Sequence, residues 1–206
     1  LSTRAVLLSG VTLNGVAPSA VPTSAMQIMV SQNDKHLLAF GCQPYDGAAD
    51  DYDPLLIRWA SQDQPNEWEP RSTNSAGFLR VSRGSAIVRA IPTRQETIVL
   101  TDTHLYTLQF LGTTDVFGLQ ELADNISIMS SRATITANNV LYWMGTDKFY
   151  AYDGRVQTLP CTLREYVFKD INFDQSDQVV CGTNEGFTEI WWFYPSADSN
   201  ANNRYV

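Results

Sequence analysis

Side chains able to do acid–base or nucleophilic chemistry are few in this sequence. The only histidines are His36 and His104, and both read as surface polar residues, His36 at the start of a strand and His104 in a turn whose counterpart in a repeat carries Lys148. The sequence holds no Gly-x-Ser-x-Gly elbow, no phosphate-binding loop and no metal-ligand motif. We therefore predict no catalytic, cofactor-binding or metal-binding residues, and a protein that is not an enzyme.

An acidic loop comes nearest to a metal site. It contains Asp46, Asp50, Asp51 and Asp53, and a hard cation such as Ca²⁺ prefers several oxygen ligands. The spacing matches no calcium loop, so the favoured interpretation is a solvated hairpin tip.

The cysteines argue against both a disulfide framework and a zinc site. Cys42, Cys161 and Cys181 are odd in number and form no Cys-x-x-Cys pair. We interpret them as buried small hydrophobic residues of a reducing compartment, unbridged.

The charge balance disfavours nucleic-acid binding. The chain has 14 basic and 22 acidic residues, a net charge of −8, and its basic residues are scattered singly. Gripping a nucleic-acid backbone requires clustered Lys and Arg that release counterions. Polar and proline interruptions at Asn14, Pro18 and Pro22 argue against a signal peptide or a membrane-spanning helix near the start of the sequence.

One strand–turn–strand pattern occurs twice, at 97–108 and 140–152. In each copy an apolar run meets a Thr-Asp pair and leaves in a strand that ends in an apolar residue and Tyr, which is typical of a hairpin. The Thr-Asp pairs begin at positions 101 and 146, so the offset is 45 residues, about one four-stranded propeller blade. We predict an all-β fold of propeller-like blades of antiparallel strands.

The other elements follow from local patterns. We expect the outer strands of the first repeat at 77–81 and 86–92, joined by a turn at Gly84. Residues 117–126 are expected to connect the two hairpins. One short helix is expected at 160–171, with Pro160 near its start. Residues 1–35 form a strand-rich N-terminal segment of unclear role, and residues 36–206 form about four blades, the last truncated, so the propeller is incomplete. Further strands are expected at 35–41, 54–60, 133–137, 178–181, 187–194 and 204–206.

The tryptophans have two interpretations. Trp59 and Trp68 are expected to pack between blades, and a platform that stacks on sugars is the alternative. Trp191 and Trp192 are adjacent on a strand, so they face opposite sides of the sheet and at least one belongs to the core.

Several segments together resemble a family of bacteriophage tail structural proteins. They are Arg58-Trp-Ala-Ser61 with Pro65-Asn-Glu-Trp-Glu-Pro70, Ala76-Gly77, Ile87 to Pro92, the Thr101-Asp102 hairpin, Asp124-Asn-Ile126, Gly145 to Gly154, and Glu189-Ile-Trp-Trp-Phe-Tyr194. The chain is similar, over about residues 36–206, to tail nozzle or tail tubular components of short-tailed phages, which are built around a β-propeller. These are packing motifs rather than active-site motifs.

The resemblance implies a virion protein, assembled in the host cytoplasm, that forms part of a ring around the DNA exit channel of the tail. It implies a homo-oligomer, six copies by analogy, beside other tail or adaptor proteins and without a membrane. DNA would pass without specific binding, and a net-negative subunit suits this because a polyanion does not adhere to it.

Two alternatives stay open. One is a carbohydrate-binding propeller module of a phage tail, in which Trp59, Trp68, Trp191 and Trp192 stack on sugars. The other is a glycan-degrading enzyme, since two of the 22 carboxylates could converge in one groove after folding.

Overall fold

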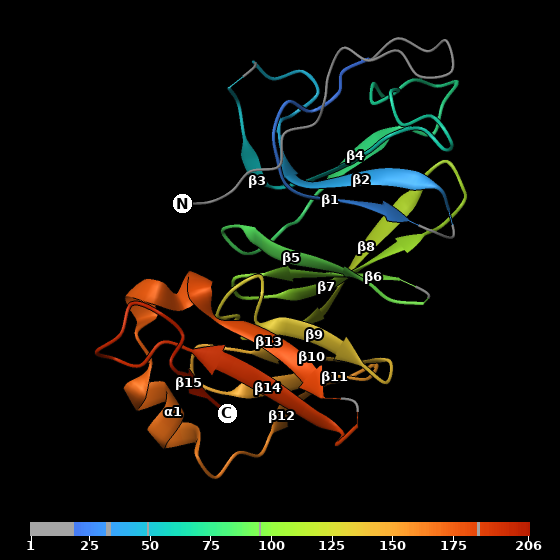
Figure 1. Cartoon of the computed structure of the whole chain (residues 1–206). Coiled ribbons are helices and arrows are strands. Elements are labelled where there is room, and N and C mark those ends of the chain that lie inside the picture. The colour runs from blue at the N-terminus through green and yellow to red at the C-terminus, as the bar shows by residue number, and fades with distance from the viewer. Residues whose placement is uncertain (1–18, 32–33, 49, 95, 185) are drawn as a thin grey trace. The chain divides into compact units, whose positions relative to one another are not determined.

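The chain divides into two compact units. The computed structural model describes residues 19–31, 34–48, 50–94, 96–184 and 186–206. Unit 1 extends to Glu121 and unit 2 begins at Leu122. Figure 1 shows strands throughout, from blue β1 to red β15, and the helix α1 late in the chain. The expectation of an all-β fold with one short helix is confirmed.

Fifteen strands form four small antiparallel sheets in the described residues. Sheet 1 contains β1–β4, sheet 2 β5–β8, sheet 3 β9–β12, and sheet 4 β13–β15. The strands are β1 Ala25–Ser31, β2 His36–Cys42, β3 Asp53–Trp59, β4 Gly77–Arg80, β5 Ile87–Pro92, β6 Thr97–Thr101, β7 Leu105–Phe110, β8 Phe117–Ala123, β9 Thr134–Ala137, β10 Val140–Met144, β11 Phe149–Tyr152, β12 Val156–Leu159, β13 Val180–Asn184, β14 Glu189–Tyr194 and β15 Arg204–Tyr205.

Each sheet is a meander in which every strand pairs with its neighbours in the chain. The two repeated hairpins, β6–β7 and β10–β11, are the central pairs of sheets 2 and 3. Both repeated turns therefore join the second and third strands of a four-stranded sheet. Their equivalence was predicted. All five residues of β6 and all four of β11 are buried, so both faces of these strands are covered.

Equivalent residues of the two repeated hairpins are 44 positions apart in the sequence, rather than the predicted 45. In the first hairpin Leu100 pairs with Leu105, and in the second Met144 pairs with Phe149. The two turns are closed by matching backbone hydrogen bonds. The Thr101 N–H donates to the His104 carbonyl at 2.9 Å, and the Gly145 N–H donates to the Lys148 carbonyl at 2.8 Å. The two Thr-Asp pairs therefore lie in equivalent turns but are displaced by one position. His104 and Lys148 are equivalent, as expected.

One of the two outer strands predicted for the first repeat is confirmed, since β5 pairs with β6, and the other, β4, was assigned wrongly from sequence. β4 pairs with β3 and completes sheet 1, whereas β5 opens sheet 2, so the turn at Gly84 connects two sheets. The segment expected as a connection contains β8, the other outer strand of sheet 2. A four-stranded meander needs two edge strands in addition to its central hairpin. Edge strands have shorter apolar runs than the central hairpin, so the sequence indicates them less clearly.

In unit 1, sheets 1 and 2 pack face to face over one hydrophobic cluster. Leu38 and Phe40 of β2 and Trp59 of β3 meet Val99 of β6 and Tyr106 of β7 in this cluster. A polar clamp crosses the same contact, because the side-chain amide of Gln27 on β1 donates to the Ala90 carbonyl at 2.7 Å and accepts from the Ala90 N–H at 2.9 Å. The Gln27 side-chain amide thus bonds both the N–H and the carbonyl of Ala90, as the backbone of a neighbouring strand would.

In unit 2, sheets 3 and 4 pack together with the helix. Met144 of β10 and Phe149 of β11 meet Trp192 of β14, and the indole N–H of Trp192 donates to the Ala133 carbonyl at 3.0 Å. α1, Arg164–Asp170, adds Val167 to the same cluster and is followed by a short 3₁₀ helix, η1, Phe173–Gln178. The predicted helix near 160–171 is confirmed.

The turn that joins β6 to β7 is tied to the connection from sheet 1 by Asp102. Its carboxylate accepts from the Ser85 N–H at 2.8 Å and from the Ser85 hydroxyl at 2.6 Å. Gly84 beside it has φ +103°, and a Cβ there would lie 2.6 Å from the Thr101 hydroxyl oxygen, so only glycine fits. Partial burial acts to raise the pKa of Asp102, but the hydrogen bonds from Ser85 and from backbone N–H groups outweigh it and hold that pKa below its ordinary value.

Replacing this carboxylate should lower stability only where it is ionised. We expect Asp102→Asn to lower the free energy of unfolding by about 1 kcal/mol at neutral pH, because two hydrogen bonds to a charged acceptor are weakened. Since the folded-state pKa is depressed, the difference from wild type should persist above the ordinary carboxyl range and disappear as the pH falls through the folded pKa. Urea unfolding at a series of pH values measures this.

Asp147→Asn is the matched control. Asp147 follows the second repeated Thr but is exposed, and its charged contact is Lys148 at 3.7 Å. We expect a change below about 0.5 kcal/mol, as for an exposed ion pair. Equal losses in the two variants would contradict the anchoring role of Asp102.

Candidate functional site

The acidic loop forms the tip of the hairpin between β2 and β3. Asp51 accepts from the Ala48 N–H at 2.7 Å, and Asp53 accepts from the Leu55 N–H at 2.9 Å and from the Arg80 guanidinium at 2.6 Å. These carboxylates serve the loop and its neighbouring strand, so the hairpin-tip interpretation is confirmed. In the described part of the chain, no three acidic, His or Cys side chains are grouped so as to hold a metal ion.

The two histidines have different surroundings. His36 was expected at the surface but is fully buried, so that expectation is wrong: its ring packs on Phe110 and Phe117, and its Nδ1 lies 2.8 Å from the Ala60 carbonyl. This distance fixes Nδ1 as the protonated nitrogen, because a carbonyl only accepts. Nε2 has no hydrogen-bond partner among the described residues. His104 lies partly exposed in its turn, beside the Thr103 hydroxyl at 2.7 Å.

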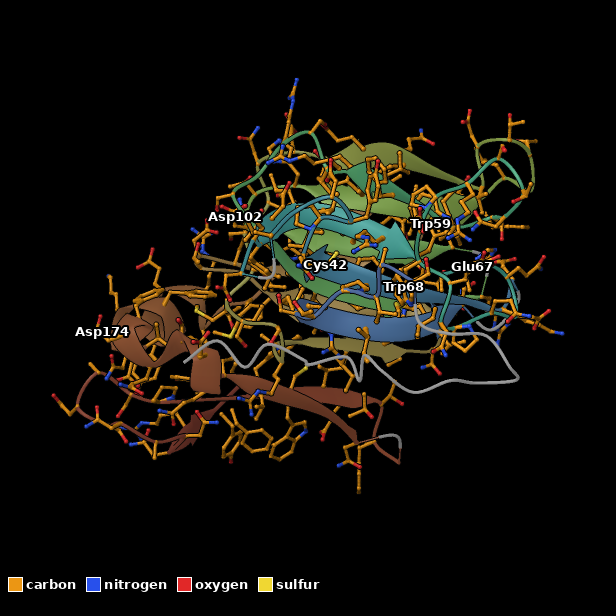
Figure 2. The ribbon with its side chains drawn as sticks, turned by 90° about the horizontal axis from the view of Figure 1, so that it is seen from above. Cys42, Trp59, Glu67, Trp68, Asp102 and Asp174 are labelled. Carbon is orange, nitrogen blue, oxygen red and sulfur yellow. The ribbon has the colours of Figure 1, made fainter. Side chains whose placement is uncertain are left out.

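Four of the five tryptophans are buried. Trp59 lies between sheets 1 and 2, which confirms its predicted packing role, and Trp192 lies in the core of unit 2. Trp68, labelled in Figure 2, is fully buried on the other face of sheet 1 rather than between sheets. Trp143 is also fully buried and stacks on Tyr150 at 4.9 Å. Trp191 alone is half-buried.

Trp191 belongs to a set of aromatic rings on the side of sheet 4 that faces away from sheet 3. We call Trp191, Phe193 and Tyr205 the aromatic face. Trp191 stacks on Tyr205 with ring centroids 4.8 Å apart, Phe193 lies 6.2 Å from each, and Tyr205 is 63% exposed. The alternation on β14 is as predicted, since Trp192 points into the core while Trp191 points away from it.

Polar groups close one end of the aromatic face. The Glu189 carboxylate accepts from the Trp191 indole N–H at 3.0 Å and from the Asn184 amide at 3.4 Å. Across the strand pair, Trp191 lies opposite Gly182, and no atom lies within 4 Å of where a Cβ would stand on that glycine. The rings therefore form a raised apolar surface beside open space, rather than an enclosed pocket.

A buried guanidinium organises the face of sheet 1 that carries Trp68. Arg58 donates from Nη1 to the Gln43 carbonyl at 2.9 Å, and from Nη2 to the Ala20 and Trp68 carbonyls at 2.6 and 3.2 Å. Its guanidinium also lies 5.9 Å from the centre of the Trp68 ring. Burial lowers the pKa of Arg58, and three carbonyls from three segments compensate for the lost water.

Arg58 should be a main source of stability in unit 1. We expect Arg58→Met to lower the free energy of unfolding by about 3 kcal/mol, because it leaves three carbonyls without a donor under Trp68. Chemical denaturation followed by intrinsic tryptophan fluorescence, to which Trp59 and Trp68 of unit 1 contribute, measures this. Arg71→Met is the control: Arg71 is an exposed arginine paired with Glu69 at 2.6 Å, so its loss should cost less than about 1 kcal/mol. Similar losses for both would contradict the assignment.

The cysteines are unbridged but not equally buried. Cys42 is fully buried between β2 and β3, whereas Cys161 and Cys181 are half-buried beside the core of unit 2, so the expectation that all three are buried is wrong in part. Burial raises the pKa of the Cys42 thiol to about 12, although Arg58 beside it acts in the opposite direction. The thiolate is the reactive form, so this thiol is chemically protected.

Thiol titration should separate the three cysteines. At pH 8 the native protein should show two thiols reacting with an aromatic disulfide reagent in an early phase, and Cys42 reacting about a hundredfold or more slowly, because thiolate fraction and access are both low. Cys42→Ala, the control, should remove only the slow phase. The denatured protein under non-reducing conditions should titrate three thiols, and a single reactive thiol there would mean that a disulfide exists.

A shallow depression lies between β12 and α1. It is lined by Thr158, Leu159, Pro160, Cys161, Thr162, Arg164 and Glu165. These residues are consecutive but for one, so the depression belongs to a single connection and does not bring distant segments together. It offers one cation, one carboxylate and one thiol without a neighbouring histidine, which is not a nucleophile–base arrangement.

Comparison with known proteins does not assign the chain. No protein-family model matches it, and no curated protein matches it. Within the described residues no helix has the length and apolar character needed to cross a membrane.

Proposed function

We propose that this protein is a structural subunit of a bacteriophage tail, in a nozzle or tube ring that forms part of the DNA exit channel. The observation that carries the proposal is the succession of four small antiparallel meander sheets, three of them with four strands, in which the central hairpins of sheets 2 and 3 are offset by 44 residues, about one propeller blade. Small meander sheets of this kind are consistent with the blades that the resemblance to tail nozzle proteins implies.

The packing within each unit supports a blade assignment. Sheet 1 lies face to face with sheet 2 in unit 1, and sheet 3 with sheet 4 in unit 2, each pair over one apolar cluster. Adjacent blades of a propeller pack in this way, through large side chains between twisted sheets. Two side chains from the motifs that carry the resemblance, Trp59 and Trp192, fill these contacts.

The charge of the chain suits a channel subunit. A net charge of −8 repels a polyanion, so DNA moving past the ring would not be held by counterion release. The alternative of a carbohydrate-binding module has lost most of its platform, since Trp59, Trp68 and Trp192 are buried and only Trp191 stays half-exposed.

Stoichiometry in purified virions tests the proposal. We expect several copies per particle, six by analogy, in one closed ring at the tail, with a total buried area per subunit contact above about 1,000 Å². Quantitative mass spectrometry of particles and imaging of the tail give both numbers. Absence from particles, or dispersed single copies without a ring, would overturn the proposal, and specific signals on a glycan array would then favour the carbohydrate-binding module.

A further inference from the structure

One face of the Trp191 indole lies beside a gap on the surface of sheet 4. Tyr205 of β15 stacks on the indole with ring centroids 4.8 Å apart, and so covers the face on that side. On the other side of β14 lies β13, where the residue paired with Trp191 is Gly182. No atom of the described residues lies within 4 Å of where a Cβ would stand on Gly182. The second face of the indole is therefore left open above this glycine.

A carboxylate stands at one end of the gap. Glu189 pairs across the strands with Asn184, the next residue after Gly182 on the same face of β13. Its Oε2 accepts from the Trp191 indole N–H at 3.0 Å and from the Asn184 amide at 3.4 Å. These two bonds hold the carboxylate at the edge of the indole. Glu189 is exposed, and in the described part of the chain no lysine or arginine forms an ion pair with it.

The hydrogen bonds at this end of the gap use its donors and leave chiefly acceptors. The indole N–H and the Asn184 amide both donate to Oε2 of Glu189. Oε1 of Glu189 accepts no hydrogen bond from the described residues, and the same holds for the side-chain oxygen of Asn184. A negative charge and free oxygens thus lie next to an open aromatic face. The group that matches them is flat, cationic and a donor only.

We infer that this gap binds a guanidinium group, the side chain of an arginine on a partner protein. We call Gly182, Glu189 and Trp191 the Gly182 notch. A guanidinium is planar, carries five N–H donors and no acceptor, and keeps its charge. Laid on the open face of Trp191 it gains a cation–π interaction, and its N–H groups can donate to Oε1 of Glu189. This site goes beyond the tail assignment and does not depend on it.

The charges of the chain favour a cationic partner. Its net charge of −8 draws a basic surface toward it and speeds their encounter. Only one residue on this face of β13 and β14 is charged, the carboxylate of Glu189, so no cation of the same face competes for it. The residues of the face are Val180, Gly182, Asn184, Glu189, Trp191 and Phe193.

Other ligands use fewer features of the notch. A saccharide hydroxyl both donates and accepts, so a sugar site supplies side-chain donors as well as acceptors. Here the indole N–H is already bonded to Glu189. A lysine ammonium is a compact, strongly hydrated charge and gains less from a flat face. A guanidinium uses the open indole face, the carboxylate and the empty space above Gly182 together.

Titration of the full chain with a small guanidinium compound tests the site. N-acetyl-arginine amide is the probe, and N-acetyl-citrulline amide, which has nearly the same shape without the charge, is its control. We expect half-saturation by the arginine compound on the order of 10 mM and at least about fivefold weaker binding of the citrulline compound. Fluorescence reports on Trp191, because the other four tryptophans are buried. In NMR the probe's Cδ protons should shift upfield, since they lie over an aromatic ring.

Filling the gap should remove the site without harming the fold. Gly182→Val places a side chain against the open indole face, so arginine binding should weaken at least about tenfold. Valine suits a strand better than glycine and meets no described atom there, so the urea midpoint should equal or exceed that of wild type. Thr183→Val is the matched control. Thr183 is the next residue on the strand and lies on its opposite face, so binding should equal that of wild type.

Glu189→Gln tests the carboxylate separately. Glutamine keeps an oxygen that can accept from the indole N–H but loses the charge. We expect arginine binding to weaken about threefold or more and to lose its dependence on NaCl, because salt screens the wild-type ion pair. The upfield shift of the bound probe should remain, since the indole face is unchanged.

Four results would overturn the inference. Equal binding of the arginine and citrulline compounds would mean that the gap does not recognise charge. Arginine binding that survives in Gly182→Val, or in Gly182→Ala if the valine variant does not fold, would place the cation elsewhere. The absence of saturable arginine binding would remove the site. Binding of methyl glucoside in its place, lost in the same Gly182 variants, would make the notch a glycan site. Virion stoichiometry tests the tail assignment separately from all of these.

Discussion

A sheet of three or four short strands cannot bury its own apolar faces, and this constraint governs the protein. β6 is buried at all five positions and β11 at all four, so the central hairpins are apolar on both sides rather than on one. Such strands are stable only with a layer on each face. The inter-sheet clusters, the loop that lays Trp68 over sheet 1, and the helix against sheet 3 are different ways of supplying that layer.

The sequence was most informative where this constraint is strongest. The paired hairpins at 97–108 and 140–152 are dense in apolar and aromatic residues, and both were predicted correctly as hairpins at equivalent positions. The edges were harder to predict, because β4 and β8 each have one partner strand and carry mixed polar and apolar residues. The sequence also did not reveal that the repeat offset is one residue shorter than the spacing of the two Thr-Asp pairs. Equivalent positions in the two turns are determined by the backbone hydrogen bonds, and not by the matching residues Thr and Asp.

The burial of individual side chains was also hard to predict from the sequence. Nothing in the letters around Arg58 or His36 indicates burial, because both lie in strands whose solvent side is covered by segments distant in sequence. Alternation did predict that Trp191 and Trp192 point to opposite sides. Which of the two would be exposed depended on the pairing of β14 with β13 and β15, and single-strand patterns do not contain that pairing.

The meander order of every sheet also bears on how the protein folds. Each strand pairs with the strand before or after it, so a sheet can form from a contiguous stretch of chain without closing a long loop. β-rich proteins fold slowly when their strands pair across large sequence separations, and here the separations are short. The sheets can therefore assemble one after another during synthesis, and the face-to-face contacts between them become the late step that gives the native state its cooperativity.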